Sequence, residues 1–377
     1  MGRKPNAEPA ARNPDPTKAW RELLGPATRS HVEFMEKLQA HYVETERDDR
    51  LKLEVEMMIE NAVKRRNLSR PPAAGNRREG TALAIIAESG AGKSTAMEHF
   101  LRDNPFFPNY AEPTGGCPLI SVQVKAPCTS RQLGMSTLRA NGYGARRELL
   151  QSEAWPQVRI QLEEQSVLFL DYQEAQRIVQ QRNDTERGQL VETLAGLMTD
   201  TTWPLYIIFQ GLPRLKGLFQ DDFLSKSRKR SSETAFDAHV TLTRRTRFVE
   251  FAPIDLKANR KDLDEGIKQY SKLGGVNLAL LGEPENRARL RHAGARQFGL
   301  FWELTVLAID VCVRAGRKVV TIDDFADAYA ARTLQPVELN PFAVDHWASI
   351  DTSIIQHRPE DEDDEPDDAP ERRREET

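Results

Sequence analysis

A run of small and polar residues at 87–95 is the part of the chain best suited to binding phosphate. It reads Ala-Glu-Ser-Gly-Ala-Gly-Lys-Ser-Thr and follows an apolar segment. Gly90 and Gly92 let the backbone turn so that successive N–H groups face one anion, and a helix starting near Lys93 adds its positive dipole end. The run is typical of a P-loop, although Ala87 stands where the pattern GxxxxGK[ST] has its first glycine.

The P-loop pattern predicts which residues hold a nucleotide. Lys93 would reach the β- and γ-phosphates, and the Ser94 hydroxyl would bind Mg²⁺. The expected cofactors are therefore ATP and Mg²⁺. The full set of expected nucleotide-binding residues in this run is Glu88, Ser89, Gly90, Ala91, Gly92, Lys93, Ser94 and Thr95.

Carboxylates follow a second apolar segment in the run Val-Leu-Phe-Leu-Asp-Tyr-Gln-Glu-Ala-Gln at 167–176. An aspartate at such a strand end usually holds the magnesium shell, and an adjacent glutamate orients the attacking water. Two alignments are open. In one, Asp171 serves the metal and Glu174 reaches back as the base; in the other, Gln173 replaces the metal carboxylate. We favour the first because the apolar run ends at Asp171, and with either alignment we expect slow ATP hydrolysis.

Polar residues near the ends of three other elements could complete the site. Gln210 follows an apolar segment and would either sense the γ-phosphate or cap the strand. Arg244 and Arg245 precede the last expected strand, where an arginine would either reach the ATP site of a neighbouring subunit or lie in a solvated basic turn. Arg296 precedes the apolar helix expected at 298–313 and is a further candidate for a phosphate contact.

Strand-like and helix-like segments alternate through the middle of the chain. We expect strands at 83–87, 119–124, 167–170, 205–209 and 247–251, which predicts an α/β domain with a parallel sheet. After Pro253 the sequence is almost entirely helical in pattern. An α/β P-loop domain followed by a small helical lid domain is the layout of an AAA+ ATPase.

Changes in composition predict five regions. We expect a disordered N-terminal tail over 1–29, a helical segment and linker over 30–80, the AAA+ nucleotide-binding domain over 81–253 and the helical lid over 254–335. A C-terminal extension with a disordered acidic tail would occupy 336–377.

Composition is typical of an intracellular protein. The three cysteines of this 377-residue chain lie far apart without metal-ligand spacing, so we expect neither disulfides nor a zinc site. No signal peptide or long apolar run occurs, so we expect no membrane insertion. The last twenty residues carry eleven acidic residues and four arginines, and the rest of the chain is therefore weakly basic. That balance permits nucleic-acid binding without requiring it.

Several short segments, taken in order, give the chain a family resemblance. They are the P-loop at 87–95, Leu-Ile-Ser-Val-Gln-Val-Lys-Ala-Pro-Cys-Thr-Ser-Arg-Gln-Leu-Gly at 119–134, Leu-Arg-Ala-Asn-Gly-Tyr-Gly at 138–144, Glu-Ala-Gln at 174–176, Phe-Gln-Gly-Leu-Pro at 209–213, Leu-Thr-Arg-Arg at 242–245 and Asn-Pro-Phe at 340–342. In their order and spacing the chain resembles the TniB/TnsC family of AAA+ transposition regulators. The resemblance covers residues 30–345.

The resemblance implies a specific function. Such proteins are similar to phage Mu B protein: they bind ATP, form rings or helical filaments on double-stranded DNA of any sequence, and present that DNA to a DDE transposase. A TniQ-type or CRISPR-associated targeting factor recruits some of them. The expected location is the bacterial cytoplasm.

Two groups of residues are candidates for contacts with DNA phosphates. Lys125, Thr129, Ser130 and Arg131 lie in the turn where the resemblance places DNA contacts. Lys226, Arg228, Lys229 and Arg230 form a basic cluster that is either a second contact or an exposed charged loop.

Two other functions remain open. A helicase loader or remodelling ATPase would use hydrolysis to do work, and vigorous DNA-stimulated ATPase activity would favour it. A scaffold that binds ATP and hardly hydrolyses it would explain the irregular residues at 171–174.

Overall fold

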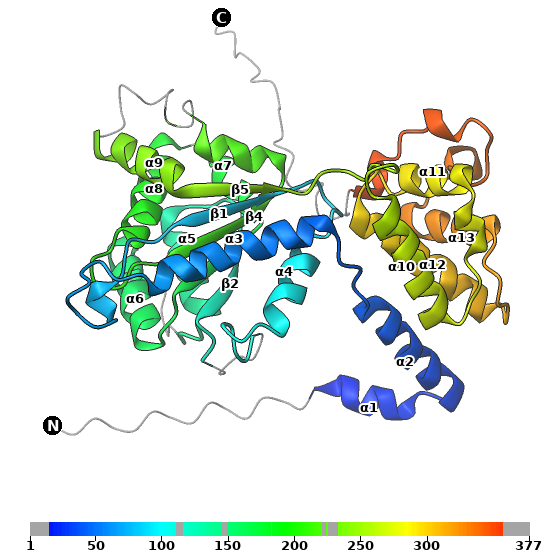
Figure 1. Cartoon of the computed structure of the whole chain (residues 1–377), viewed down its shortest axis with the longest axis horizontal. Helices are drawn as coiled ribbons and strands as arrows, with labels where there is room; N and C mark the ends of the chain where they lie inside the picture. Colours follow the sequence, from blue (N-terminus) through cyan, green and yellow to red (C-terminus); the bar gives the residue numbers. More distant parts are fainter. Residues whose placement is uncertain are drawn as a thin grey trace, which may run out of the picture.

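The computed structural model describes residues 15–110, 116–144, 149–181, 183–220, 224 and 233–356. These residues form two bodies, an α/β body around a sheet and a helical body built from the later part of the chain (Figure 1). Within the described ranges, no helix is long and apolar enough to cross a membrane.

A five-stranded parallel sheet forms the centre of the α/β body, with the strands in the order β2-β3-β4-β1-β5. Their bounds are β1 (Ala82–Ile86), β2 (Leu119–Gln123), β3 (Phe169–Gln173), β4 (Tyr206–Gly211) and β5 (Thr246–Glu250). β1 and β4 are buried along their whole length, as their nearly continuous apolar sequences require. Because the strands are parallel, their carboxyl ends share one edge, which carries the P-loop.

Helices cover both faces of the sheet (Figure 1). Leu83 and Ile85 of β1 pack with α3 (Glu46–Val63) and α4 (Lys93–Arg102) on one face. Ala84 and Ile86 belong to the core on the other face, which is covered by α5 (Ser130–Ala140), α6 (Gln151–Glu164), α8 (Asp184–Met198) and α9 (Glu233–Arg245). This alternation follows from the two-residue period of a strand. The short α7 (Gln176–Val179) and the 3₁₀ helix η2 (Pro213–Phe219) follow β3 and β4.

The helical body has its own apolar core. It contains α10 (Arg260–Gly274), the 3₁₀ helix η4 (Ala279–Gly282), α11 (Pro284–Ala293), α12 (Phe298–Arg314) and α13 (Ile322–Thr333). α12 lies at its centre, with side chains such as Phe301, Leu304 and Ile309 buried. The helix expected at 298–313 corresponds to α12.

The N-terminal region is divided between the two bodies. Leu38 of α2 (Pro26–Ala40) joins the core of the helical body, and His31 pairs with Asp310 of α12 at 2.8 Å. α3 instead packs on the sheet. The expectation of disorder over 1–29 is wrong for residues 16–29, because α1 (Pro16–Leu23) and α2 occupy them. Both helices have proline in their first turn, where the missing N–H costs nothing.

The described end of the chain returns to the P-loop. Residues 336–356 form three 3₁₀ turns, η5 (Val337–Leu339), η6 (Trp347–Ser349) and η7 (Ser353–Gln356), and Phe342 and Ile355 join the core of the helical body. The Gln356 side-chain amide donates to the carbonyl oxygen of Ser89 at 3.4 Å. The acidic segment 357–377 lies outside the described residues.

The predicted fold class is confirmed, because a parallel α/β P-loop sheet is followed by a helical part. All five expected strands are present. All differ slightly in their bounds, and the third differs most, since β3 begins at Phe169 and continues to Gln173. The shift places Asp171 inside the strand and Gln173 at its end.

Candidate nucleotide site

The loop between β1 and α4 is shaped to hold an anion. Gly90 has a φ of 76° and Gly92 a φ of 90°, the left-handed region that favours glycine. Gly92 is the N-cap of α4, which begins at Lys93. The unpaired N–H groups of the first helical turn and the helix dipole therefore act at the same place as the loop. This cradle fits the phosphates of a nucleotide.

Lys93 folds back over the loop. Its Nζ donates to the carbonyl oxygens of Ala87 at 2.8 Å and Glu88 at 3.1 Å. Burial lowers the pKa of Lys93 to about 8, although the Glu174 and Glu88 carboxylates favour its charged form. An ammonium that has lost much of its water interacts strongly with an incoming polyphosphate.

Glu174 is an exposed carboxylate that the fold brings near enough to favour the charged form of Lys93. It follows β3 directly and has a φ of 57°, an uncommon conformation for a residue other than glycine. Its Oε2 accepts a hydrogen bond from Gln176 Nε2 at 2.7 Å, and Gln176 Oε1 accepts from the N–H of Leu212 at 3.2 Å. Backbone strain that neighbouring contacts maintain is common at functional sites.

Arg47 supports the loop from the N-terminal region, although no local sequence pattern marks this residue. Its Nη1 donates to the carbonyl oxygen of Ala91 at 3.3 Å. The guanidinium lies between the rings of Phe251 and Phe298, with its central carbon 4.8 Å and 3.9 Å from their centroids. Phe251 follows β5 and Phe298 begins α12, so Arg47 joins three parts of the chain at the P-loop.

α12 supports the loop from the helical body. The N–H of Leu300 donates to the carbonyl oxygen of Gly90 at 3.1 Å. Gly299 makes this approach possible, because a Cβ there would lie 2.5 Å from the same oxygen. Both supporting hydrogen bonds end on loop carbonyl groups, so neither of them occupies a loop N–H group that could face an anion.

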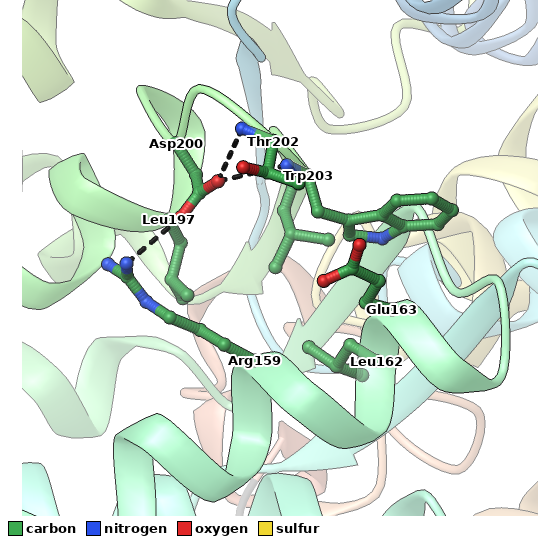
Figure 2. A pocket seen from close by; sticks show the side chains of 8 residues that line it. Arg159, Leu162, Glu163, Leu197, Asp200, Thr202 and Trp203 are labelled. Carbon is green, nitrogen blue, oxygen red and sulfur yellow. Dashed lines mark hydrogen bonds and ion pairs between the residues drawn. The ribbon is translucent and has the colours of Figure 1, made fainter. Parts of the chain in front are cut away.

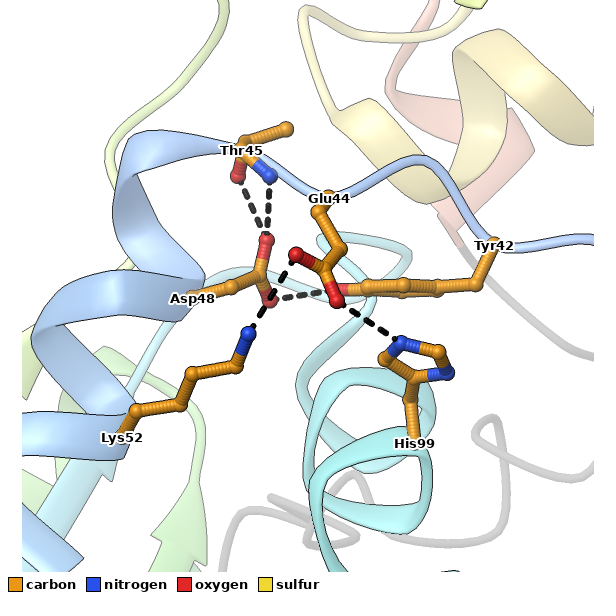
Figure 3. Close-up of polar contacts among 6 residues, drawn as sticks. All are labelled: Tyr42, Glu44, Thr45, Asp48, Lys52 and His99. Atoms are coloured by element: carbon orange, nitrogen blue, oxygen red, sulfur yellow. Dashed lines mark hydrogen bonds and ion pairs between the residues drawn. The ribbon is translucent and has the colours of Figure 1, made fainter. Parts of the chain in front are cut away.

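The segment between α2 and α3 is fastened to α4 (Figure 3). The ring of Tyr42 stacks on His99 of α4 with centroids 4.5 Å apart, and Glu44 accepts a hydrogen bond from His99 at 3.1 Å. The Tyr42 hydroxyl also donates to Asp48, which caps α3. These contacts fix the start of α3, and with it Arg47, against the P-loop helix.

Asp171 lies inside the sheet and not at its edge. The expectation that the strand ends there is wrong, because Tyr172 is buried in the core and the backbone oxygen of Gln173 accepts from Val124 at 2.9 Å. The Asp171 carboxylate has no exposed surface. It accepts hydrogen bonds from Ser121 Oγ at 2.9 Å, Gln210 Nε2 at 2.7 Å and Gln173 Nε2 at 3.2 Å. Burial raises the pKa of Asp171, and these three hydrogen bonds oppose the shift.

The residues present fit a polyphosphate better than a magnesium ion. Ser94 is exposed in the first turn of α4, as a metal-binding hydroxyl requires. The Asp171 carboxylate, however, is enclosed by its three donors, and Gln173 stands at the strand end. Within the described ranges, no three His, Cys, Asp or Glu side chains gather into a metal site. Magnesium binding by Ser94 and Asp171 stays a prediction.

Gln210 and Arg296 have different relations to the loop. Gln210 is buried in β4 and its amide donates to Asp171, while its Oε1 has no partner among the described residues. Arg296 is exposed just before α12, and both it and Ala295 are left-handed, with φ of 62° and 47°. The backbone oxygen of Arg296 accepts from Ile254 at 2.7 Å. A phosphate contact by either side chain remains a prediction.

Arg244 and Arg245 lie away from the P-loop of their own chain. They end α9, and β5 begins at Thr246, which is level with Ala82 at the amino end of β1. Arg245 forms an ion pair with Glu79. Arg244 is exposed and has no ion-pair partner among the described residues. The fold therefore does not bring these arginines to the P-loop edge of the same sheet.

The DNA-contact candidates differ in what they expose. Lys125 is exposed beyond β2, and Thr129 caps α5. Arg131 Nε donates to the carbonyl oxygen of Leu149 at 2.8 Å. Ser130 needs correction as a DNA contact, because it is buried and its backbone and hydroxyl oxygens both accept from Trp155 Nε1 at 3.0 Å. Lys226, Arg228, Lys229 and Arg230 lie outside the described residues.

Comparison with known proteins gives similar structures only. No family model and no curated protein match the chain. A structure of the Aeropyrum pernix ORC1 protein in complex with DNA has 13% identity and a TM-score of 0.49, covering 80% of this chain and 72% of that one. The Aeropyrum pernix ORC2 protein has 12% identity and a TM-score of 0.48, covering 78% and 69%.

A third similar structure is the Thermotoga maritima RuvB Holliday junction branch migration motor. It has 10% identity and a TM-score of 0.37, covering 79% of this chain and 72% of that one. At such values the likeness carries no statement about function.

A cavity of about 160 Å³ lies at the other edge of the sheet (Figure 2). It is lined by Trp203 and Leu205, which precede β4, and by the ion pair between Arg159 and Asp200 at 2.9 Å. Asp200 also accepts from the N–H groups of Thr202 and Trp203 at 2.8 and 2.9 Å. The polar groups that line this cavity thus stabilise the turn into β4. The cavity is not a candidate for the nucleotide site.

Proposed function

We propose that this chain is an ATP-dependent AAA+ protein that assembles on duplex DNA and presents target DNA to a DDE transposase. The observation that carries the nucleotide part is Lys93, half-buried in the P-loop, where the Glu174 carboxylate favours its charged form. The transposition part rests on the resemblance to the TniB/TnsC family. We place the protein in the bacterial cytoplasm on the same resemblance, with a TniQ-type or CRISPR-associated factor as its recruiter.

The position of Arg244 supports assembly into a ring or filament. An arginine at the edge opposite the P-loop cannot stabilise phosphate charge in its own site. It can do so in a neighbour whose P-loop edge packs against it, and the bound nucleotide then joins the two subunits. Bound ATP would favour the assembled form, and hydrolysis of ATP would dismantle the assembly.

Contacts with DNA phosphates are proposed for Lys125 and Thr129, with Arg131 and the 226–230 cluster as further members. Lys125 and Thr129 follow β2, whose carboxyl end shares an edge with the P-loop. Binding at the two places could therefore be linked. Contacts with the sugar-phosphate backbone of DNA alone would explain binding to DNA of any sequence.

Fluorescence anisotropy with labelled random-sequence duplex DNA tests this function. The titration is made with ATP, with ADP and without nucleotide, for the wild type and Lys93→Ala. We expect salt-sensitive binding that needs ATP and disappears in the variant. Absence of DNA binding in every state, with ATP still bound, would overturn the DNA part and indicate an ATPase that acts on proteins.

The enclosure of Asp171 favours one alternative, an ATP-binding scaffold with little hydrolysis. A metal carboxylate sealed by three hydrogen bonds would weaken catalysis while leaving the phosphate cradle intact. ATPase assays with and without DNA separate the two. A vigorous DNA-stimulated rate would exclude the scaffold and favour a motor or loader.

A further inference from the structure

We propose that Gln173, and no carboxylate, faces the metal position of the nucleotide site, so that the chain binds ATP with little help from Mg²⁺. The inference rests on the proposed nucleotide site and deepens it. It concerns the dependence of ATP binding on the metal, which the phosphate cradle alone does not determine.

Gln173 lies at the carboxyl edge of the sheet, which is the edge that carries the P-loop. β3 and β4 pair Tyr172 with Phe209, so Gln173 is level with Gln210, and Glu174 comes next, beside Lys93. Asp171 is two residues earlier, which places its backbone about 7 Å further from the edge. Of the two residues, Gln173 is therefore the nearer to the P-loop.

The face of β3 on which Asp171 and Gln173 lie follows from the alternation of side chains along a strand. Side chains two residues apart share a face, and Phe169 of β3 packs in the core beneath α4. Asp171 and Gln173 therefore lie on the α4 face, with Gln173 toward the end where α4 begins. The hydrogen bond between their side chains agrees with this placement.

Asp171 is committed to the interior. Its Oδ1 accepts from Gln210, and its Oδ2 accepts from Ser121 and Gln173. Reaching a metal shell would require breaking these bonds and opening a side chain with no exposed surface. We infer that Asp171 holds the ends of β3 and β4 together and does not reach the metal.

Gln173 offers a different ligand from the one it replaces. An amide oxygen can coordinate a hard cation but carries no net charge, whereas Mg²⁺ sites generally use at least one carboxylate. Among Asp171, Gln173 and Glu174, only the Glu174 carboxylate is exposed, and it already favours the charged form of Lys93. The attraction between this edge and Mg²⁺ is correspondingly reduced.

The test measures the affinity for a fluorescent ATP analogue in Mg²⁺ and in EDTA. For the wild type we expect the two affinities to agree within about threefold. Gln173→Asp restores a carboxylate at the edge and should make binding at least about tenfold tighter in Mg²⁺ than in EDTA. Gln165→Asp is the matched control, because Gln165 is exposed and precedes β3, at the end of the strand that lies away from the P-loop. The control should behave as the wild type does.

The outcomes separate this inference from the proposed function. A wild type that binds tenfold tighter in Mg²⁺, and loses that preference in Asp171→Asn, overturns the inference and makes Asp171 the metal residue. An unchanged preference in folded Gln173→Asp overturns it as well. If Gln173→Asp does not fold, the wild-type comparison and Asp171→Asn decide alone. Failure of wild type to bind the analogue in either buffer would instead reject the nucleotide site itself.

Discussion

Arg47 of α3 donates a hydrogen bond to the carbonyl oxygen of Ala91 in the P-loop at 3.3 Å, although 44 positions separate them in the sequence. A second donor, the N–H of Leu300 in α12, holds the preceding carbonyl group. The phosphate cradle is thus supported by the N-terminal region and by the helical body. A movement of either relative to the sheet would change the loop, and a nucleotide that orders the loop would favour one arrangement of both.

We expect Arg47→Ala to weaken ATP binding about five- to thirtyfold. The variant loses a charged hydrogen bond and two cation–π contacts, together about 1–2 kcal/mol at a partly exposed site. Arg47→Lys should recover only part of this, because an ammonium cannot lie flat between two rings. Isothermal titration calorimetry measures the affinity.

Arg50→Ala is the control for Arg47, since Arg50 lies one turn further along α3, is exposed, and donates to Phe248 and not to the P-loop. An equal loss of affinity in Arg50→Ala would show that the charge of α3, and not the contact with Ala91, is responsible.

ATP affinity should fall as the pH rises above about 8, because the pKa of Lys93 lies there before a nucleotide binds. Phosphate groups favour the charged ammonium, so above this pH binding must take up a proton. The dissociation constant then increases by up to about tenfold per pH unit, whereas below pH 8 Lys93 contributes no pH dependence. Calorimetry at pH 9 in buffers of different ionisation enthalpy measures the proton uptake directly.

Lys93→Arg is the control for the pH experiment, because arginine stays charged throughout this range. Whatever its affinity, its binding should take up no proton at pH 9. Proton uptake that persists in Lys93→Arg would assign the titration to another group.

The strands and the P-loop could be predicted because local sequence determines them. The apolar runs that form β1 and β4 have few alternatives to a buried strand, and the glycines of the P-loop fix its turn. Asp171 shows the limit of this reasoning. A polar residue after four apolar ones indicates a strand end, but here Ser121, Gln173 and Gln210 satisfy the carboxylate inside the sheet. These donors come from three strands, and no local pattern shows that they meet.

Arg47 and Gly299 could not be predicted for a related reason. Each matters through a contact with the P-loop from a distant part of the chain. Arg47 lies in a helix with many charged residues, and nothing in the sequence distinguishes it from the exposed ones. The disorder predicted over 1–29 was wrong for another reason. Proline is common both in disordered tails and in the first turn of helices, and Pro16 and Pro26 stand in the first turns of α1 and α2.

Arg244→Ala and Arg245→Ala should have separate effects. Arg244 is exposed, so its loss should leave thermal stability unchanged but reduce ATP-dependent assembly on DNA by an order of magnitude or more. Arg245 pairs with Glu79 at a half-exposed position, so its loss should cost up to about 1 kcal/mol of stability and leave assembly intact. Thermal unfolding and sedimentation with DNA and ATP measure the two effects.

Mixing Arg244→Ala with Lys93→Ala tests whether Arg244 acts on a neighbour. A mixed assembly contains interfaces at which an intact P-loop faces an intact Arg244, so part of the nucleotide-dependent assembly should return. No recovery in the mixture, with each variant folded, would contradict a role between subunits.

Lys125→Ala should reduce the salt dependence of DNA binding. Each phosphate contact that a protein loses lowers the slope of log K against log salt by about 0.9. Lys268→Ala, an exposed lysine on α10, should leave the slope unchanged. Anisotropy titrations at several salt concentrations measure the slopes.

Ser130→Ala should lower stability without changing that slope, because the Ser130 hydroxyl serves Trp155 inside the protein. Removing it costs about 1 kcal/mol and leaves the DNA-facing charge as it was. If Ser130→Ala lowered the slope while Lys125→Ala did not, the turn after β2 would have to open on DNA and expose a residue that is now buried. If neither did, and neutralising the 226–230 cluster lowered it, the DNA contact would belong to that cluster and not to the turn after β2.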